Sequence, residues 1–354
     1  SVLLNRRIYI GNVKIKDINN SVKVLSDSIF KSRANKFDSF TLDRRIDVAV
    51  GDGEDIIRLA TYADRLLQFK QNTLHIINAT KDTEFLESTH KFKGVSHHNA
   101  VCETDYGVAW CNAHGVYIYD GEQVSELLIR NGIRTISHTT WNTFYKDGET
   151  MIGYVPDTKQ LLLIRGVNSS DTGNIMIYSL IMGSWTKGTA RLGTEDKTNL
   201  INMWDGKLIY GYESDTSNGS AHEITIVPWK VDPSVAINNY KIETKEFNFG
   251  TEAKKKVSKI RITYRGASGG NTNILPKYAI NNGSFEHSFQ DDNGVAIINI
   301  VGSADWTEID LFTQSNANNI RSFSIQLTDV SGEDVASDFE VNDITMIYRT
   351  KSVK

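Results

Sequence analysis

The sequence predicts an all-β protein, with a β-propeller-like repeat domain followed by an antiparallel β-sandwich. The chain of 354 residues holds 14 Tyr, 14 Phe and 6 Trp besides many β-branched residues, and these side chains suit pleated, half-buried strands. Its 26 glycines, against only 4 prolines, supply the turns between short strands. No stretch carries a helical apolar period over three turns, and the best helix candidate, residues 81–90, is short.

Hairpin-like units repeat through the first part of the chain. The first strands of three units begin near residues 66, 108 and 151, a period of about 42 residues that matches a four-stranded propeller blade. Each unit reads as a strand, a turn and a second strand, in residues 65–78, 107–121, 150–166, 174–188 and 205–226.

Blades of this kind are expected to stack face to face, because a single sheet cannot bury both of its faces alone. About five units are visible, so a closed ring is expected to need strands upstream of Ser1 or a late strand near residues 227–229. The chain begins almost in mid-strand without Met, and it lacks the apolar core and cleavage site of a signal peptide. We therefore expect further residues upstream.

The strand pattern changes toward residue 240. The later strands are longer and alternate more cleanly, as where Ile260, Ile262 and Tyr264 lie in phase with polar residues between them. Asn-Gly turns between these strands mark hairpins. We therefore predict two domains, a propeller-like domain in residues 1–235 and an antiparallel β-sandwich in residues 236–354.

The charge balance argues against a tightly bound nucleic acid. The net charge is -4, and the longest basic run is Lys254, Lys255 and Lys256, whereas a DNA-binding surface needs a dense basic patch. We interpret this run as protection of a sheet edge, the alternative being contact with a phosphate or an acidic partner. A mildly acidic wall resists sticking and remains compatible with transient contact with passing DNA. No window of 18 apolar residues occurs, so no membrane span is predicted.

The two cysteines, Cys102 and Cys111, are separated by eight residues and could pair across a hairpin. A lone pair in a chain of this size does not make a disulfide framework. We therefore favour two reduced, packed thiols in a protein made in a cytosol.

No residue is predicted to be catalytic, to bind a cofactor or to ligate a metal. The acidic residues 47–55 lack the spacing of an EF-hand loop, and we interpret them as a charged turn between strands. Adjacent histidines on a strand point to opposite faces, so His97 and His98 are interpreted as buried or interface residues rather than ligands of one metal. Residues 183–185 lack the Asp and Gly spacing of a sialidase Asp box. Because no nucleophile elbow or phosphate-binding loop occurs either, we predict a non-enzymatic protein.

Two stretches of the sequence, residues 48–78 and 94–121, resemble a class of tailed-bacteriophage virion proteins. The nearest phrase is the hairpin of residues 107–121, where a Trp-containing strand turns into G-V-Y-I-Y-D-G. Residues 242–250 and 339–349 are compatible with the same class.

This resemblance implies a structural protein of the tail nozzle, head-to-tail connector or DNA-stabilisation type. Such proteins combine β-propellers with further β domains and form homo-oligomeric rings around the DNA exit channel. The implied partners are other virion proteins of the tail, connector or portal. The implied location is the virion tail, with assembly in the host cytoplasm. The class offers no catalytic motif to transfer to this chain.

Two other hypotheses are kept beside this one. A carbohydrate-binding, host-recognition module would use exposed aromatic rings, for which Trp306 and Trp229 are the candidates. A propeller hydrolase would need two placed carboxylates, and 43 acidic residues do not nominate a pair.

Overall fold

The computed structural model is almost entirely β. Among the residues it describes, the helical elements are one α-helix, α1 (His138–Phe144), and two 3-10 turns, η1 (His98–Ala100) and η2 (Ser315–Ala317). This composition confirms the all-β prediction. The described residues are 1–16, 19–81, 83–166, 175–188, 197–214, 223–229, 240–331, 333–336 and 338–351.

The chain divides into two compact units, unit 1 (Ser1–Trp229) and unit 2 (Lys230–Lys354). The boundary predicted between residues 235 and 236 falls within residues 230–239, outside the described residues. Each unit has its own hydrophobic core, as is typical of separate domains. Within the described parts of the chain, no helix has the length and apolar composition needed to cross a bilayer.

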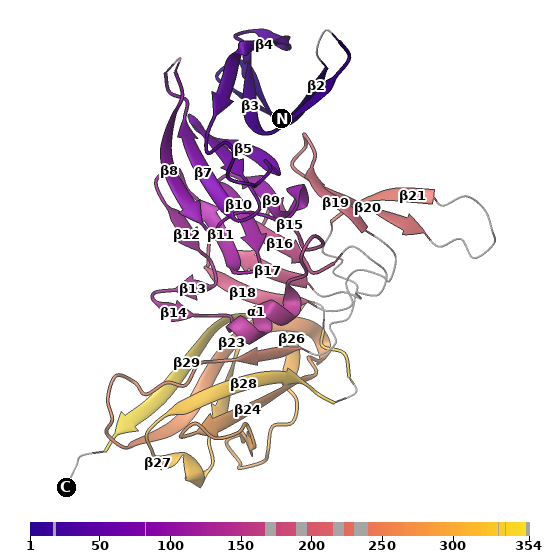
Figure 1. The fold of residues 1–354 in the computed structure, drawn as a ribbon. Helices are drawn as coiled ribbons and strands as arrows, with labels where there is room; N and C mark the ends of the chain where they lie inside the picture. The colour runs from indigo at the N-terminus through magenta and orange to yellow at the C-terminus, as the bar shows by residue number, and fades with distance from the viewer. Residues whose placement is uncertain are drawn as a thin grey trace. The chain divides into compact units, whose positions relative to one another are not determined.

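Unit 1 consists of antiparallel sheets in which each strand pairs with the next one along the chain (Figure 1). The first sheet contains β1 (Val2–Leu4), β2 (Arg7–Lys16), β3 (Val22–Arg33) and β4 (Lys36–Asp47). The second contains β5 (Arg58–Tyr62), β6 (Arg65–Phe69), β7 (Thr73–Asn78) and β8 (Phe85–Lys91). The third contains β9 (Val101–Thr104), β10 (Gly107–Asn112), β11 (Gly115–Tyr119) and β12 (Val124–Glu126).

A short ribbon follows the third sheet and is made of β13 (Ile129–Arg130) and β14 (Ile133–Arg134). The fourth sheet contains β15 (Met151–Val155), β16 (Gln160–Ile164), β17 (Ile175–Ser179) and β18 (Ser184–Gly188). The fifth contains β19 (Lys197–Asn202), β20 (Leu208–Ser214) and β21 (Glu223–Pro228).

The five sheets follow one another through their first strands. β5 contacts β1 and β2, β9 contacts β5, β15 contacts β9, and β19 contacts β15. The second to fourth sheets lie side by side in Figure 1. A Cβ added at Gly153 in β15 would lie 2.9 Å from Leu200 of β19, so glycine permits the close approach of these two strands. Stacking in chain order buries both faces of the middle sheets.

The predicted period of about 42 residues was taken between strands that occupy different places in their sheets. The hairpins of residues 65–78 and 107–121 are the second and third strands of their sheets, whereas the hairpin of residues 150–166 supplies the first and second strands. A strand–turn–strand pattern looks the same at every place in a meander, so the sequence could not show this shift. The equivalent first strands of the second to fifth sheets begin at Arg58, Val101, Met151 and Lys197.

The helix candidate at residues 81–90 is wrong. Most of it belongs to β8, which pairs with β7 along its whole length. The helix of unit 1 is instead α1, where the Ser137 Oγ accepts a hydrogen bond from the Thr140 N–H at 3.1 Å and caps the first turn. With seven residues, α1 is too short to display a helical period, and its buried side chains are Trp141 and Phe144.

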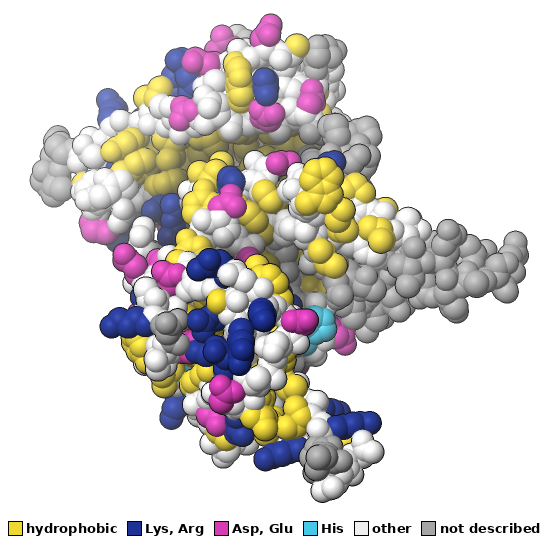
Figure 2. Space-filling view, turned by 90° about the horizontal axis from the view of Figure 1, so that it is seen from above, with side chains coloured by type: hydrophobic (Ala, Val, Ile, Leu, Met, Phe, Trp, Pro, Cys, Tyr) yellow, Lys and Arg dark blue, Asp and Glu magenta, His cyan; other side chains and the backbone are white. Residues whose placement is uncertain are grey.

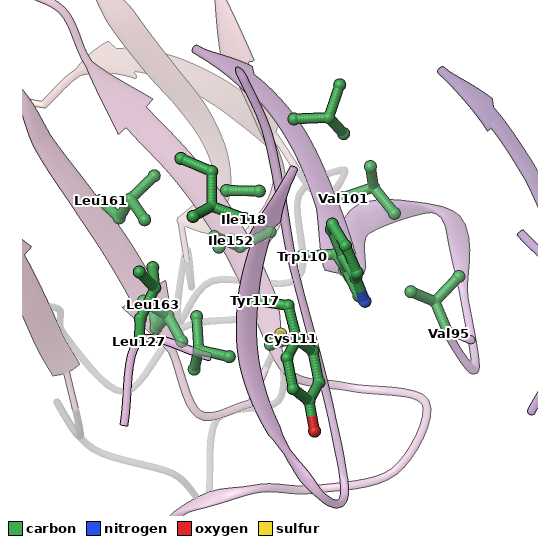
Figure 3. Close-up of a cluster of buried hydrophobic side chains, with 14 of the residues drawn as sticks. Val95, Val101, Trp110, Cys111, Tyr117, Ile118, Leu127, Ile152, Leu161 and Leu163 are labelled. Atoms are coloured by element: carbon green, nitrogen blue, oxygen red, sulfur yellow. The ribbon is translucent and has the colours of Figure 1, made fainter. Parts of the chain in front are cut away.

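The main core of unit 1 lies between the second, third and fourth sheets. Every residue of β10 and β11 is buried, and the fully buried Trp110 ring lies 5.2 Å from the Phe69 ring of β6. Figure 3 shows Leu161 and Leu163 of β16 near Ile118 of β11, all within this core. The central strands β10 and β11 of the third sheet are therefore covered on both faces.

Unit 2 contains two antiparallel sheets. One has the order β22 (Lys241–Glu243), β28 (Phe323–Asp329), β24 (Ile274–Ile280) and β25 (His287–Ser288). In the other, β23 (Lys255–Asn271) pairs with β26 (Val301–Phe312), β27 (Asn318–Ile320) and β29 (Glu340–Thr350). Both sheets contribute to one core, with Ile260, Ile262 and Tyr264 from β23 and Tyr278 from β24.

The edge-protecting role predicted for the Lys254–Lys256 run is wrong. β23 has paired neighbours on both sides, and Lys255 is fully buried in it. The Lys255 ammonium donates hydrogen bonds to the carbonyls of Thr251 at 2.5 Å and of Ala253 and Arg321 at 2.8 Å each. Three backbone acceptors compensate the desolvation of this charge, so Lys255 is a structural residue that joins segments distant in sequence.

Candidate interaction surface

A groove of about 690 Å³ lies where the first strands of four sheets, β5, β9, β15 and β19, meet in unit 1. Its walls come from the start of β5, from η1 and β9, from the end of β15 and from the β19–β20 turn. The groove therefore exists because the sheets stack through their first strands.

Several polar side chains that line this groove already form hydrogen bonds or ion pairs within the chain. The Tyr154 hydroxyl donates to an Asp105 carboxylate oxygen at 3.1 Å, and the Lys159 ammonium pairs with the same carboxylate. Hydrogen bonds from Lys159 and Tyr154 lower the pKa of Asp105. The Asn202 amide donates to the Tyr154 carbonyl at 2.8 Å. Asp105 is thus an ion-paired structural carboxylate, which does not suit it to general acid or base chemistry.

Trp204 stands at the rim of the groove and is 92% exposed. It lies in the tight β19–β20 turn, where the Met203 N–H donates to the Lys207 carbonyl at 2.8 Å and Gly206 has a φ of +82°. The turn places the indole outside the sheet. The exposed indole leaves a large apolar area open to a partner, and aromatic side chains dominate the energetics of interfaces.

The outer face of the fifth sheet carries isoleucines. Leu208 and Tyr210 of β20 point toward the fourth sheet and belong to its core. Ile209 points to the opposite face, where Ile201 lies directly across from it in β19 and Ile226 is its diagonal neighbour in β21. Ile201 is 52% and Ile226 68% exposed.

We call the exposed side chains of Ile201, Met203, Trp204 and Ile226 the terminal-sheet patch. They belong to the last sheet of the series, in the part of unit 1 that the structure describes. Figure 2 shows groups of exposed hydrophobic side chains among charged ones on one face of the molecule. Exposed apolar groups of this kind are typical of surfaces that bind another protein.

The acidic residues 47–55 form a charged turn, in agreement with the interpretation of the sequence. The Asp52 carboxylate accepts hydrogen bonds from the fully buried Lys70 ammonium at 2.7 and 2.8 Å. Glu54 accepts from the Asn72 side-chain amide at 2.8 Å. Burial acts to raise the pKa of Asp52, but hydrogen bonds from Lys70 and the Glu54 N–H outweigh it, and the pKa is lowered. This turn fastens the end of the first sheet to the β6–β7 turn.

The sequence interpretation placed His97 and His98 on a strand, but the structure places them at the start of η1. His97 precedes η1, and its Nε2 lies 2.8 Å from the Thr150 carbonyl, while His98 opens η1 and is exposed. His97 is thus a packed residue, and the described residues contain no cluster of three potential metal-ligating side chains.

The two cysteines are free, as expected from their spacing in a large chain. Cys102 lies in β9 and Cys111 in β10, but the residue opposite Cys102 is Ala109 and the residue opposite Cys111 is Val116. Burial raises the pKa of both thiols, that of Cys111 to about 12. They are therefore inert packing residues.

The two tryptophans proposed from the sequence for glycan binding, Trp229 and Trp306, lie in different units. Trp229 is half-buried against the core between the fourth and fifth sheets, and Trp306 is 46% exposed over the Arg265 guanidinium in unit 2, 4.9 Å away. Trp204, the most exposed large apolar side chain among the described residues, was not among these candidates. Its signal was the Trp-Asp-Gly sequence of residues 204–206, because an Asp-Gly turn directly after an aromatic residue puts that ring at a tip.

Comparisons with known proteins identify no family. No protein-family model matches the chain, and no curated protein matches it. A chain from a crystal structure of the Mitotic Checkpoint Complex is 12% identical with a TM-score of 0.36, over 61% of this chain and 64% of that chain. A carbohydrate-binding module of the β-sandwich superfamily is 11% identical with a TM-score of 0.16, over 56% of this chain and 97% of that chain. These likenesses are too low to support a conclusion about function.

The stability of unit 1 is expected to fall as the pH drops below about 6.5. Burial lowers the pKa of His75, His90 and His97, and Lys70 lowers that of His75 further. The unfolded chain takes up protons at these sites near pH 6.5, before the folded chain does, so acidification favours unfolding. Calorimetry of the full chain between pH 7.5 and 5.5 should show a falling midpoint for unit 1.

The matched test of this expectation is His75→Gln, with His287→Gln in unit 2 as control. The His75 variant should lessen the pH dependence of the unit 1 midpoint, whereas the control should leave it unchanged. A unit 1 midpoint that is constant or rises over this range would contradict the expectation.

Proposed function

We propose that the protein is a non-enzymatic structural subunit of a tailed-phage virion. It forms part of a homo-oligomeric ring in the tail or head-to-tail connector, around the channel through which DNA leaves. The propeller-like arrangement of unit 1 and the β-sandwich arrangement of unit 2 belong to this proposal. Residues 107–121 carry the sequence resemblance on which the assignment to a virion rests.

The observation that carries the assembly part of this proposal is the terminal-sheet patch. Within unit 1 the sheets bury their faces against one another in chain order, and the fifth sheet ends the described series with isoleucines on its outer face. A head-to-tail contact between copies closes into a ring when the rotation between subunits permits it. Apolar side chains supply the main driving force for such a contact.

The assembly prediction is tested with the double variant Trp204→Ala/Ile226→Ser. We expect it to weaken self-association by at least tenfold, because it removes a large aromatic anchor and an exposed aliphatic side chain. Sedimentation velocity over a concentration series gives the association constant. The matched control is Ile181→Ser, since Ile181 is 69% exposed but lies in the β17–β18 turn outside the patch. Equal association of wild type and double variant would contradict the role of the patch.

The virion part of the proposal has its own test. Mass spectrometry of purified particles should detect the chain in many copies per virion, and imaging of the particle should place it in the tail or connector. Absence of the chain from purified particles would rule the proposal out, whatever the outcome of the association measurements.

A second candidate function, binding of a carbohydrate, is favoured by one observation. Trp204, whose side chain is 92% exposed, lines the same groove as Asn202 and Glu103, and an aromatic platform with polar neighbours suits a sugar ring. A glycan array distinguishes the two functions. Glycan binding that is lost in Trp204→Ala while self-association persists would favour this candidate, and the absence of any glycan signal would exclude it.

A further inference from the structure

A second pocket of unit 1, about 560 Å³ in volume, has a different chemistry from the groove. It lies at the ends of β8, β10 and β11 and beside α1. Its lining includes the amines of Lys91 and Lys93 and two aromatic side chains, Phe92 and Tyr117. Its volume is in the range of pockets that hold small ligands.

The lining of this pocket holds two lysines, Lys91 and Lys93, and one carboxylate, that of Glu126. Glu126 lines the pocket, but one of its oxygens already accepts a hydrogen bond from Arg134 at 2.7 Å. Within the described chain, Lys93 forms no ion pair, and its ammonium lies 3.5 Å from the centroid of the buried Tyr117 ring. Burial lowers the pKa of Lys93, and the charge of Glu126 offsets this effect only in part. An anion in the pocket would therefore stabilise the charged amine.

The aromatic part of the pocket is held in a costly conformation. Phe92 has a φ of +62° and is 62% exposed, although bulky residues rarely adopt positive φ. The Asn112 side-chain amide holds this segment by donating to the carbonyls of Phe92 at 3.1 Å and Gly94 at 2.8 Å. A Cβ on Gly94 would lie 2.3 Å from the Lys70 carbonyl oxygen, so the segment also packs tightly against the β6–β7 turn.

The Phe92 ring meets the His114 ring edge-to-face at 5.6 Å. The exposed Phe92 side chain lines the same pocket as Lys91 and Lys93. Backbone strain combined with an exposed side chain is typical of positions where the conformation serves binding.

We propose that this pocket binds a nucleoside monophosphate unit, with the phosphate at Lys91 and Lys93 and the base stacked on Phe92. Amines provide point charges for a phosphate, and an aromatic ring stacks on any base. Asn142 and His138 of α1 also line the pocket and provide further hydrogen-bonding groups. The unit can come from a free nucleotide or from a single strand of nucleic acid. The inference does not depend on ring assembly, because all of its residues lie in one chain.

Binding is measured by calorimetry on the full chain with three probes, namely inorganic phosphate, AMP and a short single-stranded DNA oligonucleotide. We expect AMP to bind with a Kd of roughly 10 µM to 1 mM, and more tightly than inorganic phosphate because the base adds stacking. An oligonucleotide that competes with AMP and binds more tightly identifies a strand as the source. An oligonucleotide that binds more weakly identifies the free nucleotide.

Two variants separate the phosphate and base contributions. Lys93→Met removes the charge but keeps an unbranched apolar side chain, and it should weaken AMP binding at least tenfold. Phe92→Asn tolerates the positive φ, so it should weaken AMP but leave inorganic phosphate unchanged. Lys36→Met, at an exposed position in the first sheet, is the control and should match the wild type. The proposal is overturned if AMP does not bind at millimolar concentration, or if Phe92→Asn binds AMP as well as the wild type does.

Discussion

Replacing Trp110 by Ala is expected to destabilise unit 1 by about 3–5 kcal/mol. The Trp110 side chain is fully buried in the middle of the third sheet, with its ring centroid 5.2 Å from that of Phe69 and 5.6 Å from that of Tyr117. The variant leaves a cavity that neighbouring strands, paired on both sides of β10, cannot close. Calorimetry should show the unit 1 midpoint falling by about 10 °C.

Two further variants make this prediction specific. Trp204→Ala removes the same side chain from a site that is 92% exposed, and it should change the free energy of unfolding by less than about 0.5 kcal/mol. Trp110→Phe should cost only about 1 kcal/mol, because the Trp110 Nε1 has no hydrogen-bond acceptor in the described chain and Phe removes that unsatisfied donor. A loss in Trp110→Ala no larger than in Trp204→Ala would show that the third sheet is not the centre of the core.

Replacing Asp52 by Asn is expected to destabilise unit 1 by about 2–3 kcal/mol. Asp52 is the carboxylate partner of the fully buried Lys70 ammonium, which also donates to the Ala49 carbonyl at 2.8 Å. Breaking a buried ion pair costs about 3–5 kcal/mol because one charge is left without compensation. The Asp52 side chain is 33% exposed, so water reaches the site and reduces the loss. Urea unfolding of wild type and variant at pH 7 gives the difference.

The double variant Lys70→Met/Asp52→Asn tests whether charge is the cause. It removes the buried ammonium together with its partner, and it should be more stable than Asp52→Asn alone. Additive losses from the two single variants would show that the residues act independently. The ion pair should persist over most of the acid range, because the lowered pKa of Asp52 means that its stabilisation is lost only as the pH falls below about 4.

Residue types and local patterns were sufficient to predict much of the architecture. Aromatic and β-branched residues between Gly- and Asn-containing turns predicted strands, and the hairpin predicted in residues 107–121 is formed by β10 and β11. The in-phase Ile260, Ile262 and Tyr264 do lie in the core of unit 2. These predictions succeeded because strand formation and burial depend on the period of the sequence itself.

Sequence patterns predicted the candidate surfaces less well than the fold. The exposure of Trp204 depends on the place of its turn in the fold, and the pocket beside Phe92 joins residues from strands and a helix that are separated by up to 51 positions. The single residue that sequence patterns could have flagged was Trp204, through its Asp-Gly turn. A site built from side chains of several elements leaves no periodic pattern in the sequence.

The sequence by itself determined that this protein is all β, with a run of hairpins followed by longer strands. The tertiary structure decided which hairpins occupy the same place in their sheets. It also decided that most of residues 81–90 form β8 and no helix, and that Lys255 is buried among three carbonyls. The physical reason is the range of the interactions. Alternation and turn chemistry act over a few residues, whereas the place of a strand in its sheet and the solvation of a charge depend on segments distant in the chain.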